Sequence, residues 1–168
     1  MDIASLLIEL YGRLPPLAHQ AVHGLSREEL VAQPVPEANT IAWLVWHTAR
    51  VQDHHVSEIL DTRQIWVEGT WAERFGLEAD PLNTGYGHAP ADVRAVSPVQ
   101  PSDLEDYLDA VQERTVTWLR ALTAVDLDGV VDRRWDPPVT LGVRLVSIAD
   151  DALQHLGQAA YVRGLLVH

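Results

Sequence analysis

Asp151 and His155 are the residues whose types and spacing point most directly to chemistry. They lie four residues apart in the segment D151-A-L-Q-H-L-G-Q158, and at helical spacing two such side chains rise from one face about 6 Å apart, where they could grip one metal ion. Both fall on an apolar stripe with Ile148 and Ala159. An ionised aspartate that faces a core is destabilising unless a cation or strong donors satisfy it. The spacing therefore indicates a shared metal ion, and a simple hydrogen bond between the two side chains is the alternative.

His47 is the candidate for a third ligand. It lies in a second apolar segment, between Trp46 and Thr48. His54 shares its helical face but lies seven residues on, roughly 10 Å along a helix axis, so these two histidines cannot hold one ion. A metal at His47 needs ligands from another helix, and the pair in the last segment supplies them. The alternative for His47 is a packed core histidine.

Three side chains of the last segment are candidates for contacts to the ligands or to a substrate. Gln158 follows His155 by three residues and is placed to orient its imidazole. Arg144 lies seven residues before Asp151, and Arg163 lies eight after His155. Either guanidinium could bind an anionic group in a bidentate way. The alternative for both is an arginine near a helix end that reaches water.

Further candidates lie outside that segment. Asp53, His54 and His55 are adjacent, so on a helix they point about 100° apart, and we expect mainly a polar helix edge from which His54 could face a substrate. His88 lies in a glycine-rich loop that could fold over a site, although loop histidines are usually solvated. Trp135 precedes D-P-P, a rigid loop that could form a pocket wall.

The amino-acid composition limits which classes of protein this chain can belong to. A chain of 168 residues with 47% hydrophobic residues fits one globular domain over 1–168. A net charge of −12 without a basic face argues against nucleic acid as a partner. Apolar runs fall far short of the ~20 residues that span a bilayer, so we expect a cytoplasmic protein without a membrane partner. The chain has no cysteine, so thiol chemistry would need a thiol from another molecule.

The segments that position these residues show the period of amphipathic helices. The expected helices span 3–25, 39–60, 102–122 and 140–166. Pro15 and Pro16 should kink or break the first. Ser26, Asn39 or Thr40, Ser102 and Thr140 should cap helix starts. The connection over 61–101 is long and partly helical at 70–75. Because no convincing period-two alternation appears, we expect an all-α four-helix bundle with a long connection between its second and third helices.

Two segments resemble the DinB/YfiT-like superfamily of metalloenzymes: N39-T-I-A-W-L-V-W-H-T-A-R50 and D151-A-L-Q-H-L-G-Q158. The stretches 71–76, 84–88 and 131–146 extend the resemblance along nearly the whole chain. They are similar to an uncharacterised bacterial branch, close to the metal-binding domain of mycothiol-dependent maleylpyruvate isomerases. In the family pattern, His47 and His155 match two metal ligands. Asp151 takes the remaining ligand position, where many relatives have histidine and the isomerases have glutamate.

The resemblance implies a bundle whose metal assists chemistry on a low-molecular-weight thiol. Two neutral imidazoles and one carboxylate leave a divalent ion with a net charge of about +1 and open positions, which favours a bound thiolate. Such a thiolate could attack a small electrophilic substrate. Zinc is the first candidate ion, with nickel, iron or manganese as alternatives. All basic residues are arginine, which suggests a GC-rich genome and is consistent with mycothiol as the thiol. Isomerase activity itself is not carried over, because the isomerases have an additional C-terminal domain.

The same ligand set allows other functions. Two histidines and one carboxylate also form the facial triad of non-haem iron oxygenases, and a metal-bound hydroxide could carry out hydrolysis. A different class is a non-catalytic bundle that binds a small molecule or a partner, in which Asp151 and His155 are simply paired. A homodimer is compatible with each of these hypotheses.

Overall fold

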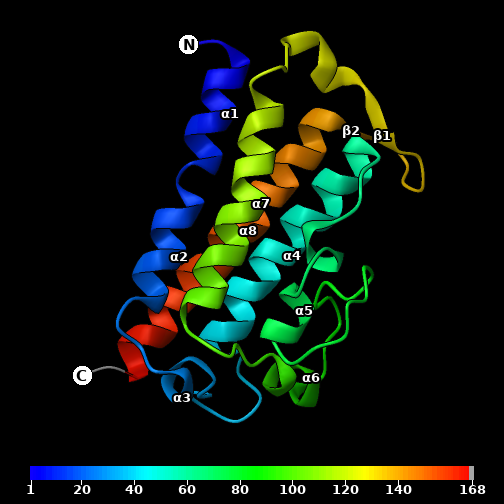
Figure 1. The fold of residues 1–168 in the computed structure, drawn as a ribbon. Coiled ribbons are helices and arrows are strands. Elements are labelled where there is room, and N and C mark those ends of the chain that lie inside the picture. The colour runs from blue at the N-terminus through cyan, green and yellow to red at the C-terminus, as the bar shows by residue number, and fades with distance from the viewer. Residues whose placement is uncertain (167–168) are drawn as a thin grey trace.

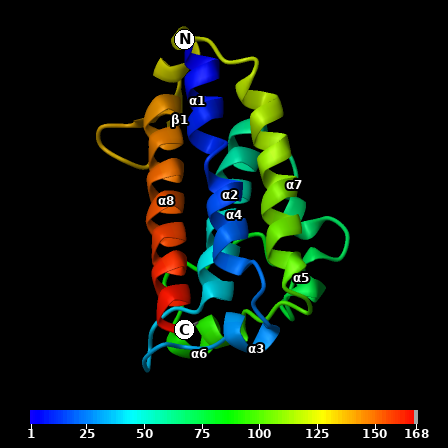
Figure 2. The ribbon, with the colours of Figure 1, turned by 90° about the vertical axis from the view of Figure 1, so that its left-hand side faces the viewer.

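The long helices of the chain pack side by side as a four-helix bundle (Figures 1 and 2). The computed structural model describes residues 1–166. Two short helices in line, α1 and α2, form the first member of the bundle. The members are α1 (Ile3–Tyr11) with α2 (Leu14–Val22), α4 (Ile41–Leu60), α7 (Ser102–Leu119) and α8 (Leu141–Leu166). Both α2 and α4 pack against α7 and α8, which confirms the predicted bundle.

The first member breaks just before its prolines. The structure ends α1 at Tyr11 and begins α2 at Leu14, so that Pro15 and Pro16 fall in the first turn of α2. Backbone N–H groups in a first turn have no partner within the helix, and proline is tolerated there. The prolines therefore begin a helix instead of kinking one.

Polar caps fix two of the predicted helix starts. At the start of α3 (Arg27–Leu30), the backbone N–H of Glu29 donates to the Ser26 hydroxyl, and the Glu29 carboxylate accepts from the backbone N–H of Ser26. Thr40 accepts from the backbone N–H of Trp43 at 3.0 Å and starts α4. The predicted box at Ser102 is wrong, because α7 has Pro101 at its N-cap without a side-chain cap. The Asp103 carboxylate instead accepts from the backbone N–H of Gln100, outside the helix.

Short elements fill the connections. Between α4 and α7 lie η1 (Ile65–Val67), α5 (Trp71–Arg74) and α6 (Pro90–Ala95), and η2 (Ala124–Asp128) follows α7. An antiparallel ribbon of β1 (Val130–Asp132) and β2 (Val139–Thr140) precedes α8. Strands this short carry too little alternation to be predicted from sequence. The loop of this ribbon presents Arg134 and Trp135 beside α4 and α8.

Asp53 holds the long connection against α4, which corrects the expected polar helix edge. It is 1% exposed, and its carboxylate accepts from the backbone N–H groups of Ile65 and Trp66. Tyr107 donates its hydroxyl to the same carboxylate at 2.8 Å, and Arg50 forms an ion pair with it at 3.5 Å. A carboxylate is tolerated in a core only when donors satisfy it in this way.

Arg50 continues this network into the loop that reaches His47. Its guanidinium is fully buried and donates to the backbone carbonyls of Pro81 and Asn83. The connection between α4 and α7 therefore runs along α4 (Figure 1) with its backbone fixed to that helix. Among the residues that the structure describes, no helix has the length and apolar character needed to cross a membrane.

Candidate metal centre

His47 on α4 and the pair Asp151 and His155 on α8 converge on one point. Nε2 of His47 lies 3.8 Å from Asp151 Oδ2, and Nε2 of His155 lies 3.5 Å from Asp151 Oδ1. One potential ligand atom from each residue lies within 4.8 Å of the others. These separations are too long for good hydrogen bonds. They are slightly longer than the roughly 3.3 Å that separates donor atoms around a tetrahedral zinc ion, so a small inward movement would let the three hold one ion.

The ring of His47 is oriented from behind by a backbone carbonyl. Nδ1 of His47 bonds to the carbonyl oxygen of Thr84, which requires Nδ1 to carry the proton and leaves Nε2 with a free lone pair. The ring also stacks on Trp43, with centroids 4.6 Å apart and planes 8° from parallel. His47 therefore presents one nitrogen to the centre in a fixed direction.

Gly85 permits this close approach of the loop to His47. A Cβ atom added there would lie 2.8 Å from His47 Nδ1 and about as close to the rings of Trp43 and Trp46. Its φ of 93° is also a conformation that other residues rarely adopt. The glycine is thus required for the contact between the Thr84 carbonyl and His47.

Gln158 orients His155 in the same manner, as its spacing suggested. Its side-chain oxygen lies 3.2 Å from Nδ1 of His155, which places the proton on Nδ1 and frees Nε2. The imidazole also meets the edge of Trp43, with centroids 5.9 Å apart. Each histidine therefore has one nitrogen committed to an acceptor and the other directed at Asp151.

The Asp151 carboxylate gives the clearest indication that these three residues fit a cation. Its Oδ2 is buried and has no hydrogen-bond partner within residues 1–166, although about a third of the whole side chain is exposed. A buried carboxylate oxygen without a donor is strongly unfavourable. A divalent ion bound by the two free imidazole nitrogens would satisfy it.

The pKa values of the two histidines are shifted in opposite directions. Burial lowers the pKa of His47, and this outweighs the effects of the Thr84 carbonyl and of Asp151. The Asp151 carboxylate raises the pKa of His155 against the effect of burial. His47 is therefore neutral at pH 7, which is the form that binds metals.

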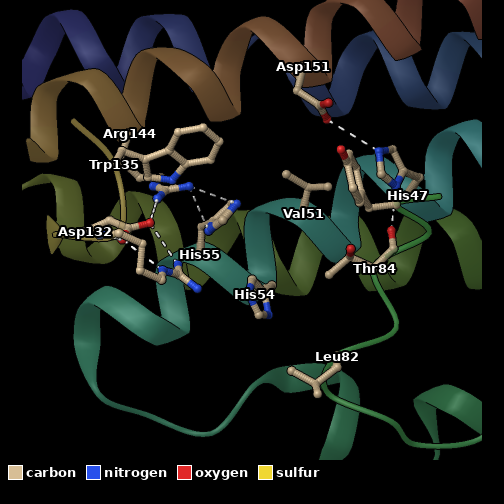
Figure 3. Close-up of a pocket in the computed structure, with 12 residues that line it drawn as sticks. His47, Val51, His54, His55, Leu82, Thr84, Asp132, Trp135, Arg144 and Asp151 are labelled. Carbon is tan, nitrogen blue, oxygen red and sulfur yellow. Dashed lines mark hydrogen bonds and ion pairs between the residues drawn. The ribbon is translucent and has the colours of Figure 1, made fainter. Parts of the chain in front are cut away.

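A pocket of about 590 Å³ opens beside His47 and Asp151 (Figure 3). His47 and Asp151 lie at one end of it, Val51 lies in the middle, and Arg144 and Trp135 lie at the other end. Its full lining is His47, Val51, His54, His55, Leu82, Thr84, Tyr86, Asp132, Arg134, Trp135, Arg144 and Asp151. The structure thus brings His54, Trp135 and Arg144, all candidates from the sequence, to the same cavity as His47 and Asp151.

Two sequence candidates lie elsewhere. His88 does not line the pocket: its Nδ1 accepts from the Trp43 indole at 3.1 Å and its Nε2 lies 2.9 Å from the Asn83 side-chain oxygen. It therefore ties its loop to α4 behind Trp43. Arg163 lies about 12 Å beyond His155 along α8 and donates to the backbone carbonyl of Ala21. Arg163 shares a helical stripe with His155 but lies toward the end of α8. The pocket extends in the opposite direction, toward the start of α8, so Arg163 does not line it.

Two charged residues of the pocket, Asp132 and Arg134, were not predicted from the sequence. Asp132 and Arg134 lie on the ribbon before α8, where Arg134 binds the Asp132 carboxylate through its backbone N–H and two guanidinium nitrogens, at 2.8 to 2.9 Å. Arg144 adds a contact to the same carboxylate at 2.8 Å. The only signal in the sequence was the spacing of aspartate and arginine by two residues in V131-D-R-R134, which suits a turn after a strand.

Known proteins resemble the chain along almost its whole length. The family model of mycothiol-S-transferase matches residues 17–167. A conserved protein from Enterococcus faecalis, known from a crystal structure, is 32% identical, and the match covers 99% of this chain and 98% of that chain with a TM-score of 0.90. Comparison with curated proteins gives no match. By the extent of the family match, the chain belongs to the mycothiol S-transferase family.

Proposed function

We propose that the protein is a metal-dependent transferase that joins a low-molecular-weight thiol to a small electrophile. The observation that carries the proposal is the convergence of one imidazole nitrogen each from His47 and His155 on the Asp151 carboxylate, whose Oδ2 is buried and has no hydrogen-bond partner within residues 1–166. Membership of the family supports a thiol as the nucleophile, and mycothiol is the thiol that the family is named for. The chain itself has no cysteine, so it offers no thiol of its own.

His47, Asp151 and His155 would hold the ion, which we propose to be zinc. Two nitrogens and one carboxylate oxygen are a common donor set for catalytic zinc, which keeps a further position for a substrate. When bound, the ion supplies a positive charge that lowers the pKa of a thiol and holds the resulting thiolate. The Asp151 carboxylate would balance one of the ion's two charges and leave a net charge of about +1 to attract a thiolate.

The remaining residues bind and orient the reactants. Thr84 and Gln158 hold the two imidazoles in place, and Val51 forms an apolar wall beside the centre. In the transfer, the thiol proton passes to solvent and the sulfur forms a bond to the electrophilic carbon. The bond from that carbon to its leaving group breaks, and the leaving group departs with the electron pair. No cysteine, disulfide or redox step is needed.

A fluorogenic transfer assay tests this proposal. Zinc-loaded protein is incubated with mycothiol and monochlorobimane, in which sulfur displaces chloride. We expect a rate above the uncatalysed reaction that chelation of the metal abolishes, and that His155→Ala lowers at least about a hundredfold. Asp150→Asn, on the exposed side of α8, is the control and should keep the rate. Equal rates in wild type and His155→Ala, or a rate that does not depend on added thiol, would overturn the proposal.

A further inference from the structure

The pocket continues from His47 and Asp151 to an end lined by arginine. Arg144 lies seven residues before Asp151 on α8, so the two ends are about 10 Å apart along the helix axis. Figure 3 shows Arg144, Trp135, Asp132 and His55 grouped at this end, with Val51 between them and His47. The proposed function does not use this end of the pocket.

Two guanidinium groups share a single carboxylate there. Arg134 and Arg144 both bind Asp132, which is 6% exposed. Hydrogen bonds from Arg134, and then the charges of both arginines, hold the pKa of Asp132 well below its usual range. Among the described residues, the second positive charge therefore has only a solvent-exposed carboxylate as its partner. Glu58 is the nearest other carboxylate, 3.7 Å from Arg134, and it is half exposed to solvent, where an ion pair contributes little.

Hydrogen-bond donors are also left over at this end. Arg134 donates to Asp132 through its backbone N–H, Nε and Nη2, and Arg144 does so through Nη2. Within the described part of the chain, Nη1 of Arg134 and Nε of Arg144 make no hydrogen bond. A guanidinium group with free donors in a pocket suits the two oxygens of a carboxylate.

A second metal ion is the competing occupant. Ligand atoms of His54, His55 and Glu58 also lie within 4.8 Å of one another. However, Nη1 of Arg144 lies 3.3 and 3.4 Å from the two ring nitrogens of His55, so a permanent cation already lies against one of the three side chains that would bind the ion. Burial and Arg144 also lower the pKa of His55 to about 4. The cluster therefore suits an anion better than a cation.

The pocket also has exposed apolar and aromatic side chains in its lining. Three large side chains line it, and they are exposed by 78% (Leu82), 93% (Tyr86) and 65% (Trp135). Aromatic side chains with this exposure at the rim of a polar pocket are suited to cover a flat, apolar ligand. The ligand should thus combine a flat body with a negative end.

We propose that this end of the pocket is a subsite for the carboxylate of a small aromatic or unsaturated acid, held by Arg144 and Arg134 and covered by Trp135. The assignment of that acid to the electrophile rests on the proposed function, because the thiol would occupy the metal end. The electrophilic carbon then lies toward His47 and Asp151 while the carboxylate is fixed some bonds away. Substrates with a carboxylate should be selected over their neutral counterparts.

Calorimetric titration with benzoate and benzamide tests the subsite without requiring turnover. Wild type should bind benzoate about ten- to a hundredfold more tightly than benzamide, the range for a hydrogen bond to a charged group. Arg144→Met should remove this preference. Arg134→Met should reduce it, and this variant guards against misfolding because the Arg134 side chain is 71% exposed. Equal affinity for the two probes, no binding of either at millimolar concentration, or an unchanged preference in both arginine variants would overturn the subsite.

Two further arms separate the subsite from the metal centre. His155→Ala, stripped of metal, should keep the preference for benzoate, since Arg134 and Arg144 do not depend on the ion. Loss of the preference there would mean that benzoate binds the metal, and would overturn the subsite. Zinc-loaded protein saturated with mercaptoethanol should also keep the preference for benzoate. Competition between mercaptoethanol and benzoate would contradict the assignment of the bound acid to the electrophile. Failure of metal binding would overturn the proposed function and leave these results intact.

Discussion

His47 Nε2 and Asp151 Oδ2 face each other across α4 and α8 at 3.8 Å, with no hydrogen bond between them. The two side chains approach from antiparallel helices (Figure 1), and His47 is fixed from behind by the Thr84 carbonyl. The imidazole of His47 therefore cannot donate a hydrogen bond to Asp151 Oδ2 unless it gives up its hydrogen bond to the Thr84 carbonyl. The buried Asp151 oxygen thus stays without a donor, which is unfavourable. Under the proposed function, this arrangement would be preorganised for an ion that binds both atoms.

Gly85→Ala should weaken metal binding although Gly85 is not a ligand. The added Cβ would meet His47 Nδ1 at 2.8 Å, so the loop must move and the Thr84 carbonyl must leave the imidazole. Loss of such an orienting contact typically lowers metal affinity about 10- to 100-fold, measurable by competition with a chromophoric chelator. Gly87→Ala is the matched control, because Gly87 also has positive φ but open space around it. Equal losses in both variants would assign the effect to backbone strain alone.

Gln158→Leu should also weaken the metal affinity, by about 10-fold or more. The variant removes the acceptor for Nδ1 of His155, so the ring can rotate and its tautomer is no longer fixed. The same chelator competition measures the effect. Gln154→Leu, on the same helix but bonded to Asp150, should keep the wild-type affinity. An unchanged affinity in Gln158→Leu would show that the contact does not orient the ligand.

Asp53→Asn should strongly destabilise the fold. The substitution leaves the fully buried Arg50 guanidinium without its anion and weakens the cap on η1. Removing one partner of a buried ion pair lowers the free energy of unfolding by about 3–5 kcal/mol, and urea denaturation measures it. Asp150→Asn, an exposed carboxylate, should change it by no more than about 0.5 kcal/mol. Similar effects of the two substitutions would exclude a supporting role for Asp53.

His55 should make the protein less stable in mild acid. Burial and the Arg144 guanidinium, with a smaller effect of His54, lower its pKa from 6.5 to about 4, and Glu58 opposes this only in part. The unfolded chain then binds more protons than the folded chain between about pH 6.5 and pH 4, so stability falls as the pH decreases through this range. In His55→Gln this contribution is absent. Denaturation curves at about pH 7 and pH 5 should therefore differ less in the variant than in wild type; an equal difference would contradict the lowered pKa.

The bundle could be predicted from the sequence because its helices obey local rules. The apolar period and the caps at Ser26 and Thr40 depend on neighbours within four residues, and these agree with the structure. The last helix begins at Leu141 after Thr140, as its pattern indicates. The spacing of Asp151 and His155 likewise placed both on one face of that helix.

Contacts between segments that are distant along the chain could not be predicted from the sequence. Asp53 is adjacent to two histidines, which suggests a polar edge, yet backbone N–H groups from a loop 12 and 13 residues later bury it. The same holds for the Thr84 carbonyl at His47, since any residue has a carbonyl and only the fold brings this one to the ring. Arg134 and Arg144 meet only because β1 pairs with β2, and those strands are too short to show a period.

The metal content of the purified chain tests the central claim most directly. Protein prepared without chelator, equilibrated with zinc and then desalted, should contain about one divalent ion per chain by elemental analysis. His47→Ala and His155→Ala should each lose most of it, while Asp150→Asn should keep it. A wild-type chain without bound ion, or the same content in His155→Ala as in wild type, would contradict a metal centre at His47, Asp151 and His155.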